Sequence, residues 1–385
     1  MTVILTILSS ITLLIILISN IEIFLAWKSV TYLRDIEPQF GKKAPCVSII
    51  VPARNEEKEI AIALQSLLRQ DYTNLEIIVI NDRSTDRTRE ILDEFARNYS
   101  NLQVIHKTEL PEDWLGKNHA LKVGSTYAHG QYLLFIDADV VMKKNTTVSK
   151  AIQFMLDHNL DHLAVAPEMR AATWKIDLMV GTFIYYFNLI TKPWRAQNPN
   201  SRYSVGIGAF NLLKAETYKA IGTHRAIALR PDDDIMMGKL VKSHGYRQQA
   251  VFGKRLIRIQ WYFSVRDMIE GLMKNSASFV SYSLVWALML CFALFLLFVF
   301  PFVAVLITPA PACWFYLATS IVITLTYLFA TGEYHLTRWY ALLIPFSTCV
   351  LIYIMLKASI QTRRNKGIYW RGVFYPLDKL RNFKV

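Results

Sequence analysis

Four stretches of this sequence are long and apolar enough to cross a lipid bilayer as helices: 3–27, 284–307, 313–330 and 339–356. The hydrocarbon core of a bilayer is about 30 Å thick, so a spanning helix needs roughly 20 apolar residues. Hydrophobic residues make up 53% of the chain, which is more than an ordinary soluble domain requires. The sequence therefore predicts an N-terminal transmembrane anchor over 1–27 and about three transmembrane segments within 284–356.

Basic residues flank the first stretch on one side only. Lys28, Arg34, Lys42 and Lys43 follow it, and no basic side chain precedes it. Cytoplasmic loops of membrane proteins carry an excess of Lys and Arg, so the region 28–280 is expected on the cytosolic face of a multi-pass cell-membrane protein. The first stretch also lacks the basic start and small-residue cleavage site of a signal peptide, so an uncleaved anchor is expected.

The segment 357–385 is a basic tail that contains a Trp-Arg-Gly motif. It holds eight basic residues and one acid, Asp378, for a net charge of +7. Beside an apolar block such a cluster favours binding to anionic lipid headgroups over nucleic acid, although it could also be a solvated tail. Three full C-terminal spans would place this tail outside the cell. Either one segment lies along or dips into the membrane, or the tail is an exception.

The region 44–280 reads as one α/β domain. Short runs rich in β-branched residues alternate with segments of helical periodicity. Strands are predicted at 46–52, 75–82, 102–107 and 132–140, and helices at 55–70, 84–99 and 116–128. Asn55 and Ser84 are the expected caps of the first two helices. Such alternation predicts a mainly parallel sheet with right-handed crossovers.

Polar motifs stand where these strands end. The segments VPARNE (51–56), INDRSTD (80–86) and DADV (137–140) all fall at carboxyl ends, where α/β sheets bind ligands. Asp137 and Asp139 are carboxylates one residue apart, which suits Mg²⁺ or Mn²⁺ shared with phosphate groups. The sequence contains neither a Gly-x-x-x-x-Gly-Lys nor a Gly-x-Gly-x-x-Gly motif, so a P-loop ATPase and a Rossmann dehydrogenase are not supported.

Taken together, the segments SIIVPARNEE, IIVINDRSTDRT, FIDADV and DDDIMMGKLVKSHGY resemble the successive motifs of family 2 glycosyltransferases, over roughly 46–275. WLGKNHA, EGLMKN and GIYWRGVFYP are similar to the membrane-bound, lipid-glycosylating subgroup that includes the hopanoid-associated and diaponeurosporenoate glycosyltransferases. The resemblance implies a GT-A fold with flanking transmembrane helices. It also implies an inverting enzyme that moves one sugar from a nucleotide-sugar donor, a UDP-hexose, to a membrane lipid such as a polyprenoid, hopanoid, carotenoid-like lipid or glycerolipid.

The resemblance also implies a role for each matching residue. Asp82 would bind the nucleotide base, with Pro52, Arg54 and Glu56 lining the base and ribose. Asp137 would face the ribose or diphosphate, Asp139 would ligate Mg²⁺ or Mn²⁺, and Lys117 would add a second cation to the diphosphate. Two of these side chains have simpler explanations. Glu56 could be a first-turn acid that favours the helix dipole, and Lys117 could lie on a solvated face.

The acidic run Asp232 to Asp234 bears on the mechanism. By resemblance, Asp233 takes the place of the family's first acid and Asp234 is the general base that removes a proton from the acceptor hydroxyl. A base within reach contributes about 10²–10⁴-fold to a rate. The alternative is a plain cluster of acids at a helix N-terminus. Asp232 could also be the cap while Asp234 acts as the base.

Two other functions compete with this prediction. A processive polysaccharide synthase is expected to carry a Gln/Arg-x-x-Arg-Trp motif, but here Gln260 precedes Trp261. A catalytically inactive membrane scaffold would be expected to lose nucleotide binding. It would have no need to retain the acids at positions 82, 137, 139 and 234.

Overall fold

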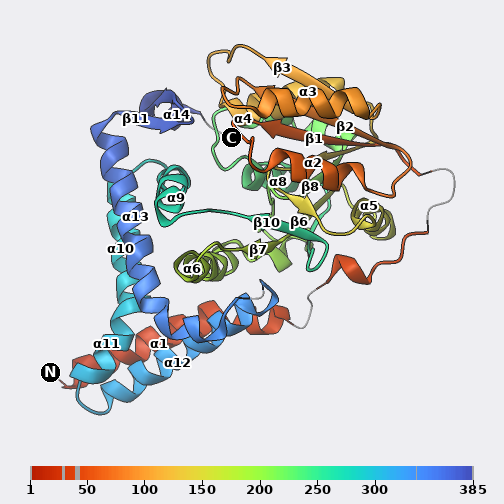
Figure 1. Cartoon of the computed structure of the whole chain (residues 1–385). Coiled ribbons are helices and arrows are strands. Elements are labelled where there is room, and N and C mark those ends of the chain that lie inside the picture. The colour runs from red at the N-terminus through yellow and green to blue at the C-terminus, as the bar shows by residue number, and fades with distance from the viewer. Residues whose placement is uncertain (1, 28–30, 40–43, 335, 384–385) are drawn as a thin grey trace. The chain divides into compact units, whose positions relative to one another are not determined.

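The computed structural model describes residues 2–27, 31–39, 44–334 and 336–383 (Figure 1). Lys28, Lys42 and Lys43, which carry most of the predicted orientation signal, lie outside the described residues. The chain forms two compact units, which we describe separately: an α/β unit over 30–170 and 193–260, and a helical unit over 1–29, 171–192 and 261–384. The division into domains at 44–280 and 284–356 stays a prediction.

A seven-stranded sheet is the centre of the α/β unit, with strand order β3-β2-β1-β4-β8-β6-β9. Its strands are β1 (Val47–Ala53), β2 (Leu75–Asp82), β3 (Leu102–Lys107), β4 (Tyr132–Phe135), β6 (His162–Ala166), β8 (Asn211–Lys214) and β9 (Gln248–Phe252). Only β8 runs antiparallel to its neighbours β4 and β6. The predicted mainly parallel sheet is therefore confirmed.

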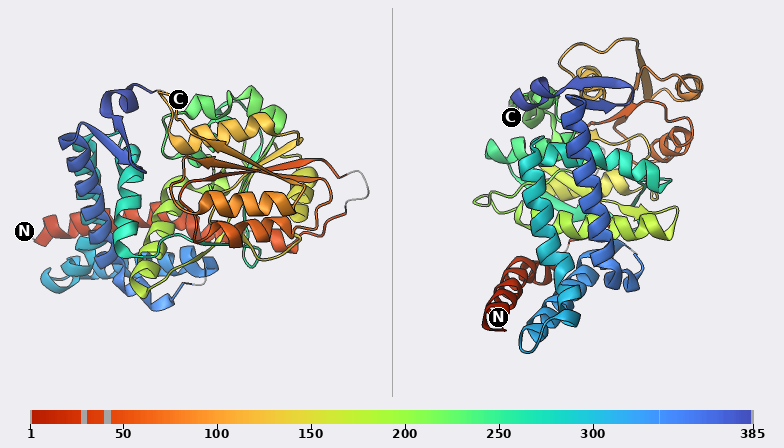
Figure 2. Two further views of the ribbon diagram at one scale, coloured as in Figure 1. Left: turned by 45° about the horizontal axis from the view of Figure 1, so that its top comes forward. Right: turned by 90° about the vertical axis from the view of Figure 1, so that its left-hand side faces the viewer.

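Helices cover both faces of this sheet (Figures 1 and 2). They are α2 (Ile60–Leu68), α3 (Thr88–Asn98), α4 (Gly116–Tyr127), α5 (Thr147–Asp157), α7 (Ala215–Ala220) and α8 (Asp233–Ser243), with short 3₁₀ turns at Leu33–Asp35, Pro193–Arg195 and Thr223–Ile227. A smaller sheet joins β5 (Val141–Met142), β10 (Ile257–Gln260) and β7 (Glu168–Arg170). Alternate residues of β1 point to opposite faces: Ile49 packs into a core with Leu64 of α2, and Ile50 into a core with Leu121 of α4.

Two helices begin later than the sequence predicts. The first starts at Ile60 rather than Asn55, and the second at Thr88 rather than Ser84. Asn55 has a φ of 55°, in the left-handed region, so it does not cap a right-handed turn. Its N–H donates to Ser84 Oγ at 3.0 Å. Asn55 and Ser84, the two residues expected as helix caps, therefore connect the loop after β1 to the loop after β2.

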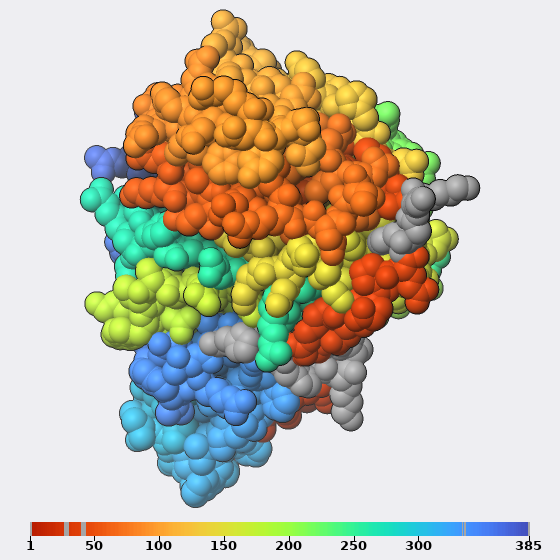
Figure 3. Space-filling model, turned by 45° about the vertical axis from the view of Figure 1, so that its right-hand side comes forward, coloured from red at the N-terminus to blue at the C-terminus, as the bar shows by residue number. Residues whose placement is uncertain are grey.

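Two acids, Glu57 and Asp86, extend this link between the loops. The Glu57 N–H donates to Asp86 Oδ2 at 3.1 Å, and the Arg87 N–H donates to Glu57 Oε2 at 3.1 Å. Because each loop supplies both a donor and an acceptor, the carboxyl ends of β1 and β2 are held side by side. The outer surfaces of α2 and α3 form one continuous orange face in Figure 3.

Among its described residues the helical unit contains four helical stretches long and apolar enough to cross a membrane: 2–26, 284–307, 312–331 and 338–364. Its elements are α1 (Thr2–Trp27), α6 (Trp174–Thr191), α9 (Val265–Phe279), α10 (Leu284–Leu294), a π-helical turn (Phe295–Val299), α11 (Phe300–Ile307), α12 (Ala312–Thr331), 3₁₀ turns at Gly332–Tyr334 and Arg338–Leu343, α13 (Ile344–Arg364), β11 (Gly367–Trp370), β12 (Val373–Pro376) and α14 (Leu377–Asn382). The π-helical turn precedes Pro301, whose missing N–H interrupts regular helix bonding.

Asn20 and Glu22, the polar interruptions of the first apolar stretch, both contact the end of α6. Tyr185 OH donates to Asn20 Oδ1 at 2.7 Å, and Lys192 Nζ lies 3.1 Å from Glu22 Oε1. Polar side chains between apolar helices act as specific contacts, since each would otherwise be left without a partner. These interruptions therefore fix α6 within the helical unit, although α6 lies between two strands of the α/β unit in sequence.

A buried histidine makes the stability of the α/β unit depend on pH. His162 on β6 is fully buried, its Nε2 pairs with Asn211 Oδ1, and its Nδ1 has no partner among the described residues. Burial lowers the pKa of His162 to about 4, against the opposing effect of the hydrogen bond that His162 makes to Asn211 Oδ1.

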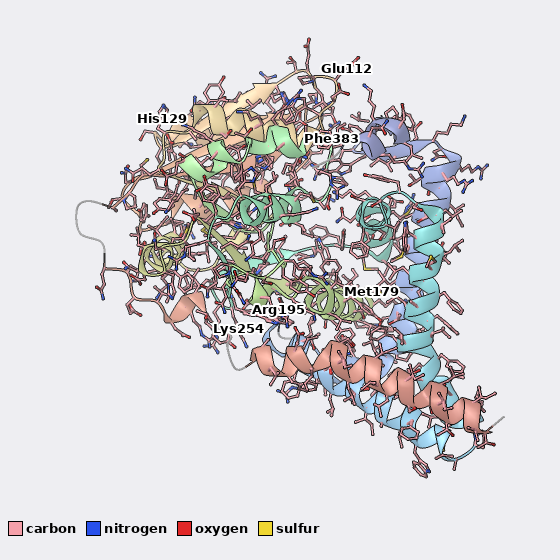
Figure 4. The ribbon with its side chains drawn as sticks, turned by 180° about the vertical axis from the view of Figure 1, so that it is seen from behind. Glu112, His129, Met179, Arg195, Lys254 and Phe383 are labelled. Atoms are coloured by element: carbon pink, nitrogen blue, oxygen red, sulfur yellow. The ribbon has the colours of Figure 1, made fainter. Side chains whose placement is uncertain are left out.

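The unfolded chain binds a proton at His162 near pH 6.5 and the folded chain does so only near pH 4, so this contribution to stability is complete above about pH 6.5 and is lost as pH falls toward 4. We expect a loss of about 3 kcal/mol from this group. Denaturant unfolding at a series of pH values measures it, and His162→Gln should flatten the curve. The control variant His129→Gln, at an exposed position labelled in Figure 4, should not flatten the curve of unfolding free energy against pH. Equal curves for the parent chain and both variants would contradict the assignment to His162.

Candidate active site

Polar side chains gather where β1, β2 and β4 end, at one edge of the parallel part of the sheet. The register places Pro52 beside Ile80, so the segments that follow these strands leave the sheet together. Two helices also begin there, α4 with Gly116 and Lys117 and α8 with Asp233. The predicted site residues form two clusters, one around Asp82 and one around Lys117.

Asp82 ends β2 and is held by three cations. Arg83 donates from Nε and Nη2 to the two carboxylate oxygens, both at 2.9 Å, and Lys107 Nζ donates to Oδ1 at 3.2 Å. Arg54 Nη1 lies 3.8 Å from Oδ2. Burial would raise the pKa of Asp82, but the Arg83 hydrogen bonds and the Lys107 charge outweigh it and hold this pKa below its usual range. A nucleotide base would have to share this carboxylate with the cations.

Gly116 connects this cluster to the next one. A Cβ at position 116 would lie 2.5 Å from Asp82 Oδ2 and 3.0 Å from Arg83 Nη2, so only glycine lets the start of α4 pack against Asp82. The following residue, Lys117, then extends into the second cluster. Arg83, Lys107 and Gly116 were not identified from the sequence; Arg83 directly follows Asp82, but nothing local marks Lys107 as its partner.

Lys117 joins carboxylates from two distant segments. Its Nζ lies 2.8 Å from Asp137 Oδ1 and 3.3 Å from Asp233 Oδ1. Burial would lower the pKa of Lys117, but the charges of Asp137, Asp233 and Asp234 outweigh it and raise this pKa. The structure therefore places Lys117 among the acidic residues rather than on a solvated face.

The three acids of the run 232–234 have different surroundings. Asp233 is 5% exposed and faces Lys117. Asp234 is partly exposed, with its Oδ2 accepting from the Gly208 N–H at 2.7 Å and its Oδ1 from the Ile235 N–H at 2.8 Å. Burial, together with the charge of Asp137, raises the pKa of Asp234 against the opposing charge of Lys117. Asp234 is thus the more accessible acid of the two.

Asp232 does not cap the helix with its side chain, as the sequence suggested it could. It occupies the N-cap position of α8, but its side chain makes no capping hydrogen bond there. Arg230 binds its carboxylate instead, with Nε and Nη2 at 3.0 and 2.8 Å from the two oxygens. This bidentate pair leaves Asp233 and Asp234 to face the site.

A glycine-containing segment, 205–208, packs against the Lys117 cluster. A Cβ at Gly206 would lie 1.7 Å from the Asp234 carbonyl oxygen. A Cβ at Gly208 would lie 2.8 Å from Asp137 Oδ2, 3.4 Å from Asp234 Oδ2 and 3.5 Å from Lys117 Nζ. Sequence analysis missed this segment, although two glycines one residue apart before a buried strand could have marked a close backbone approach.

Alanine at these two positions should separate stability from activity. Gly208→Ala meets only the ends of side chains, so the chain should fold but lose activity by about 10²-fold through displaced side chains. Gly206→Ala meets backbone, so it should lower the melting temperature first. Thermal unfolding and sugar transfer measure the two effects.

Gly245→Ala is the control for this pair. A Cβ there would meet nothing within 4 Å, but Gly245 has a φ of 79°, so the change should cost about 1 kcal/mol of stability with activity retained. Unchanged activity in Gly208→Ala would show that this glycine does not shape the site.

Asp139 fits a divalent cation. Burial raises the pKa of Asp139 to about 7, and the negative charges of Asp137 and Glu56 add to this rise. Among the described residues no Lys or Arg side chain lies within 4 Å of its carboxylate. In the same part of the chain no cluster of three His, Cys, Asp or Glu side chains could hold a metal ion alone. A hard cation bound here would therefore take further oxygen ligands from a phosphate group or water.

Glu56 lies at the turn that leads into α2 and also close to this acidic group. It precedes the first helical residue of α2, Ile60, and the Ile60 N–H donates to its carbonyl oxygen at 2.9 Å. Its carboxylate is close enough to raise the pKa of Asp139. Whether Glu56 serves the nucleotide or only the start of α2 stays a prediction.

Comparisons with known proteins show what this chain is similar to. Residues 48–222 match the family described as Glycosyl transferase family 2. A 4,4'-diaponeurosporenoate glycosyltransferase of Staphylococcus haemolyticus (strain JCSC1435) is 26% identical over 247 residues, 62% of either chain. An enzyme of the same name from Staphylococcus aureus (strain USA300) is 31% identical over 192 residues, 49% of this chain and 48% of the relative. The chain thus spans about half to three fifths of the length of these curated relatives.

A solved structure shares the fold. A mannosyltransferase from Pyrobaculum calidifontis, in complex with GDP-Man and Mn²⁺, superposes with a TM-score of 0.55 at 18% identity, covering 94% of this chain and 99% of that one. The predicted GT-A fold is therefore confirmed.

Proposed function

We propose that this chain, which carries a glycosyl transferase family 2 domain, is an inverting, metal-dependent glycosyltransferase that moves one sugar from a nucleotide-sugar donor to a membrane lipid. The observation that carries the proposal is the gathering of Asp137, Lys117 and Asp234 around Gly208 within the matched fold. The lipid acceptor rests on the names of the relatives and on the long apolar helices. The cytosolic orientation of the α/β unit rests on flanking charge alone.

The donor would lie across both clusters. The Asp82 cluster, with Pro52, Arg54 and Glu56, would take the base and ribose, for which uracil is our first candidate. Asp139, with Asp137, would hold Mg²⁺ or Mn²⁺ beside the diphosphate. The cation, when bound, neutralises the diphosphate as it leaves. Lys117 stands between Asp137 and Asp233, so it can turn its ammonium group toward the same phosphate oxygens without leaving the cluster.

Asp234 would act on the acceptor. An acceptor hydroxyl oxygen forms a bond to the anomeric carbon while the bond from that carbon to the diphosphate oxygen breaks, which inverts the anomeric centre. The hydroxyl proton passes to Asp234. The N–H groups of Gly208 and Ile235 hold the Asp234 carboxylate in place, and burial raises the pKa of Asp234, which suits a base.

The test is nucleotide release by the full chain in detergent, over a panel of UDP-sugars and GDP-mannose, with Mn²⁺, Mg²⁺ or EDTA. We expect slow hydrolysis of one donor that stops with EDTA. Failure to bind any nucleotide by calorimetry and failure to release it would overturn the proposal and favour a membrane scaffold.

The acceptor is identified with the donor that passes this test. Labelled sugar is supplied with a lipid extract, and the products are separated into lipid and polymer fractions. Label in the lipid fraction supports the proposal, and label in a polymer supports a processive synthase. Mild alkali then separates a glycoside, which resists it, from a glycosyl ester made on a carboxylate acceptor, for which no strong base would be required.

A further inference from the structure

Within the helical unit, the start of α10 and the end of α13 lie at the same end. The two helices pack side by side, and the Cys291 thiol is 3.9 Å from the Ile352 carbonyl oxygen. The segment that precedes α10, which includes α9, contacts the segment that follows α13. Arg381 donates to the Tyr282 carbonyl oxygen, and Lys274 Nζ lies 3.9 Å from the centre of the Trp370 ring. The stretch from α10 to α11 and helix α13 are therefore antiparallel, as Figures 1 and 2 show.

This pairing decides how the C-terminal stretches can cross a bilayer. Suppose that the stretch α10–α11 crosses the bilayer in one direction and α13 crosses it in the other. Helix α12, which connects them, then begins and ends on the same side of the bilayer. Helix α12 packs instead along α1. In that case the tail emerges on the side of the bilayer where α10 begins.

The tail after α13 folds into a hairpin with two different faces. Its register pairs Ile368 with Tyr375 and Tyr369 with Phe374. Ile368 and Tyr375 are buried, at 6% and 7% exposure, whereas Tyr369 is 69% and Phe374 39% exposed. The two exposed rings contact each other, with centroids 4.9 Å apart. One face is thus packed within the helical unit and the other presents an aromatic pair.

The same part of the chain is rich in exposed cations. The last turn of α13 and the tail place exposed basic side chains next to the hairpin: Arg363, Arg364, Lys366, Arg371, Lys379 and Arg381. Asp378 is the one acid in the described part of the tail. The turn itself, Arg371–Gly372, has positive φ at both residues, 47° and 79°, which is the tight hairpin turn that presents an arginine at its tip.

We propose that the hairpin β11–β12 is an interfacial anchor seated on the anionic leaflet on the side of α9. Tyr369 and Phe374 enter the headgroup region, where Tyr and other amphipathic rings are favoured, and the exposed cations bind lipid phosphates. The occupant is a lipid surface because the hairpin directly follows a helix of spanning length, which fixes its height near the membrane interface. This inference goes beyond the proposed glycosyl transfer and does not depend on catalysis.

Hydrogen exchange of the full chain in nanodiscs tests the lipid contact. One nanodisc contains phosphatidylcholine alone and the other contains phosphatidylcholine mixed with phosphatidylglycerol. Segment 367–376 should exchange more slowly in the anionic nanodisc, on the order of fivefold or more for each cation engaged, and added salt should remove the difference. Equal exchange in both nanodiscs would overturn the proposal and indicate that protein covers the hairpin.

Variants separate charge from apolar insertion. Neutralising Arg363, Arg364 and Lys366 to Gln should weaken the dependence on phosphatidylglycerol, because three of the six cations are removed. Tyr369→Ser with Phe374→Ser should speed exchange in both nanodiscs. A matched change of three exposed cations on the α/β unit, Lys58, Arg89 and Arg97 to Gln, should have no effect on this segment. An equal effect of the control would show that total charge, not the hairpin, sets the lipid dependence.

Cysteine labelling tests which side the tail occupies. Single substitutions Asp378→Cys, Pro309→Cys and Glu112→Cys (position 112 is labelled in Figure 4) are treated with a membrane-impermeant maleimide in sealed vesicles of each orientation. We expect gains of label over the parent chain at 378 and 112 in the same vesicles, and at 309, between α11 and α12, in the opposite ones. Label at 378 together with 309 would overturn the inferred side.

Discussion

Asp234→Asn should lower kcat for transfer to a hydroxyl acceptor by about 10²–10⁴-fold, with donor affinity nearly unchanged. The amide cannot accept the acceptor proton. It also turns an NH₂ group toward one of two backbone donors, the N–H of Gly208 or that of Ile235, so the side chain loses one of its positioning bonds. Steady-state kinetics with the identified donor and acceptor, together with calorimetric titration of the nucleotide, measure both quantities.

The neighbouring acid provides the matched control for this variant. Asp232→Asn removes the same charge two residues away, but Arg230 rather than the site holds that carboxylate. We expect it to retain most of the activity. If both variants lost activity equally, the loss would reflect the charge of the whole run and not a base at position 234. Full activity of Asp234→Asn with an alkali-labile product would instead identify a carboxylate nucleophile.

Asp139→Ala should remove the metal dependence of donor binding and reduce transfer by about 10²–10³-fold, since a bound cation supplies several kcal/mol of charge stabilisation. In the folded chain, burial and the charges of Asp137 and Glu56 raise the pKa of Asp139, and a divalent cation would relieve this repulsion. Nucleotide titration with and without Mn²⁺ measures the effect. The variant with Mn²⁺ should behave like the parent chain with EDTA.

Removal of Asp139 also has a structural signature that activity does not report. The parent chain should gain thermal stability when Mn²⁺ and nucleotide are added together, because ligands that bind only the folded state stabilise it. Asp139→Ala should lose most of that gain, whereas Asp157→Ala, at the exposed end of α5, should keep it. A full gain in Asp139→Ala would place the cation elsewhere.

Local sequence patterns were sufficient for the architecture of the α/β unit. Runs such as 47–53 and 75–82 are buried on both faces, so they are nearly continuous hydrophobic segments that read as parallel strands without further information. The topology of parallel strands then places Asp82, Asp137 and Asp139 at one edge. The same local logic identified the four apolar helices, because their signal is length and composition within one segment.

Contacts between distant segments required the tertiary structure. Lys117 meets Asp233 across more than a hundred residues, Gly208 is enclosed by side chains of three segments, and Asn20 pairs with Tyr185. Asn55 fits the pattern of a helix cap, but the neighbouring loop binds it first. None of these partners is set by residue type or spacing along the chain.

The difference has a physical cause. Secondary structure and the positions of strand ends follow from periodic burial and backbone preference. Because both act over a few residues, they can be predicted from short segments of the sequence. The electrostatic state of Lys117 and Asp234, the glycines that allow close backbone approach, and the side of the membrane on which the tail emerges depend on which segments pack together. Packing is set by the whole chain, so the sequence determined where the reactive residues stand and only the tertiary structure decided what each one faces.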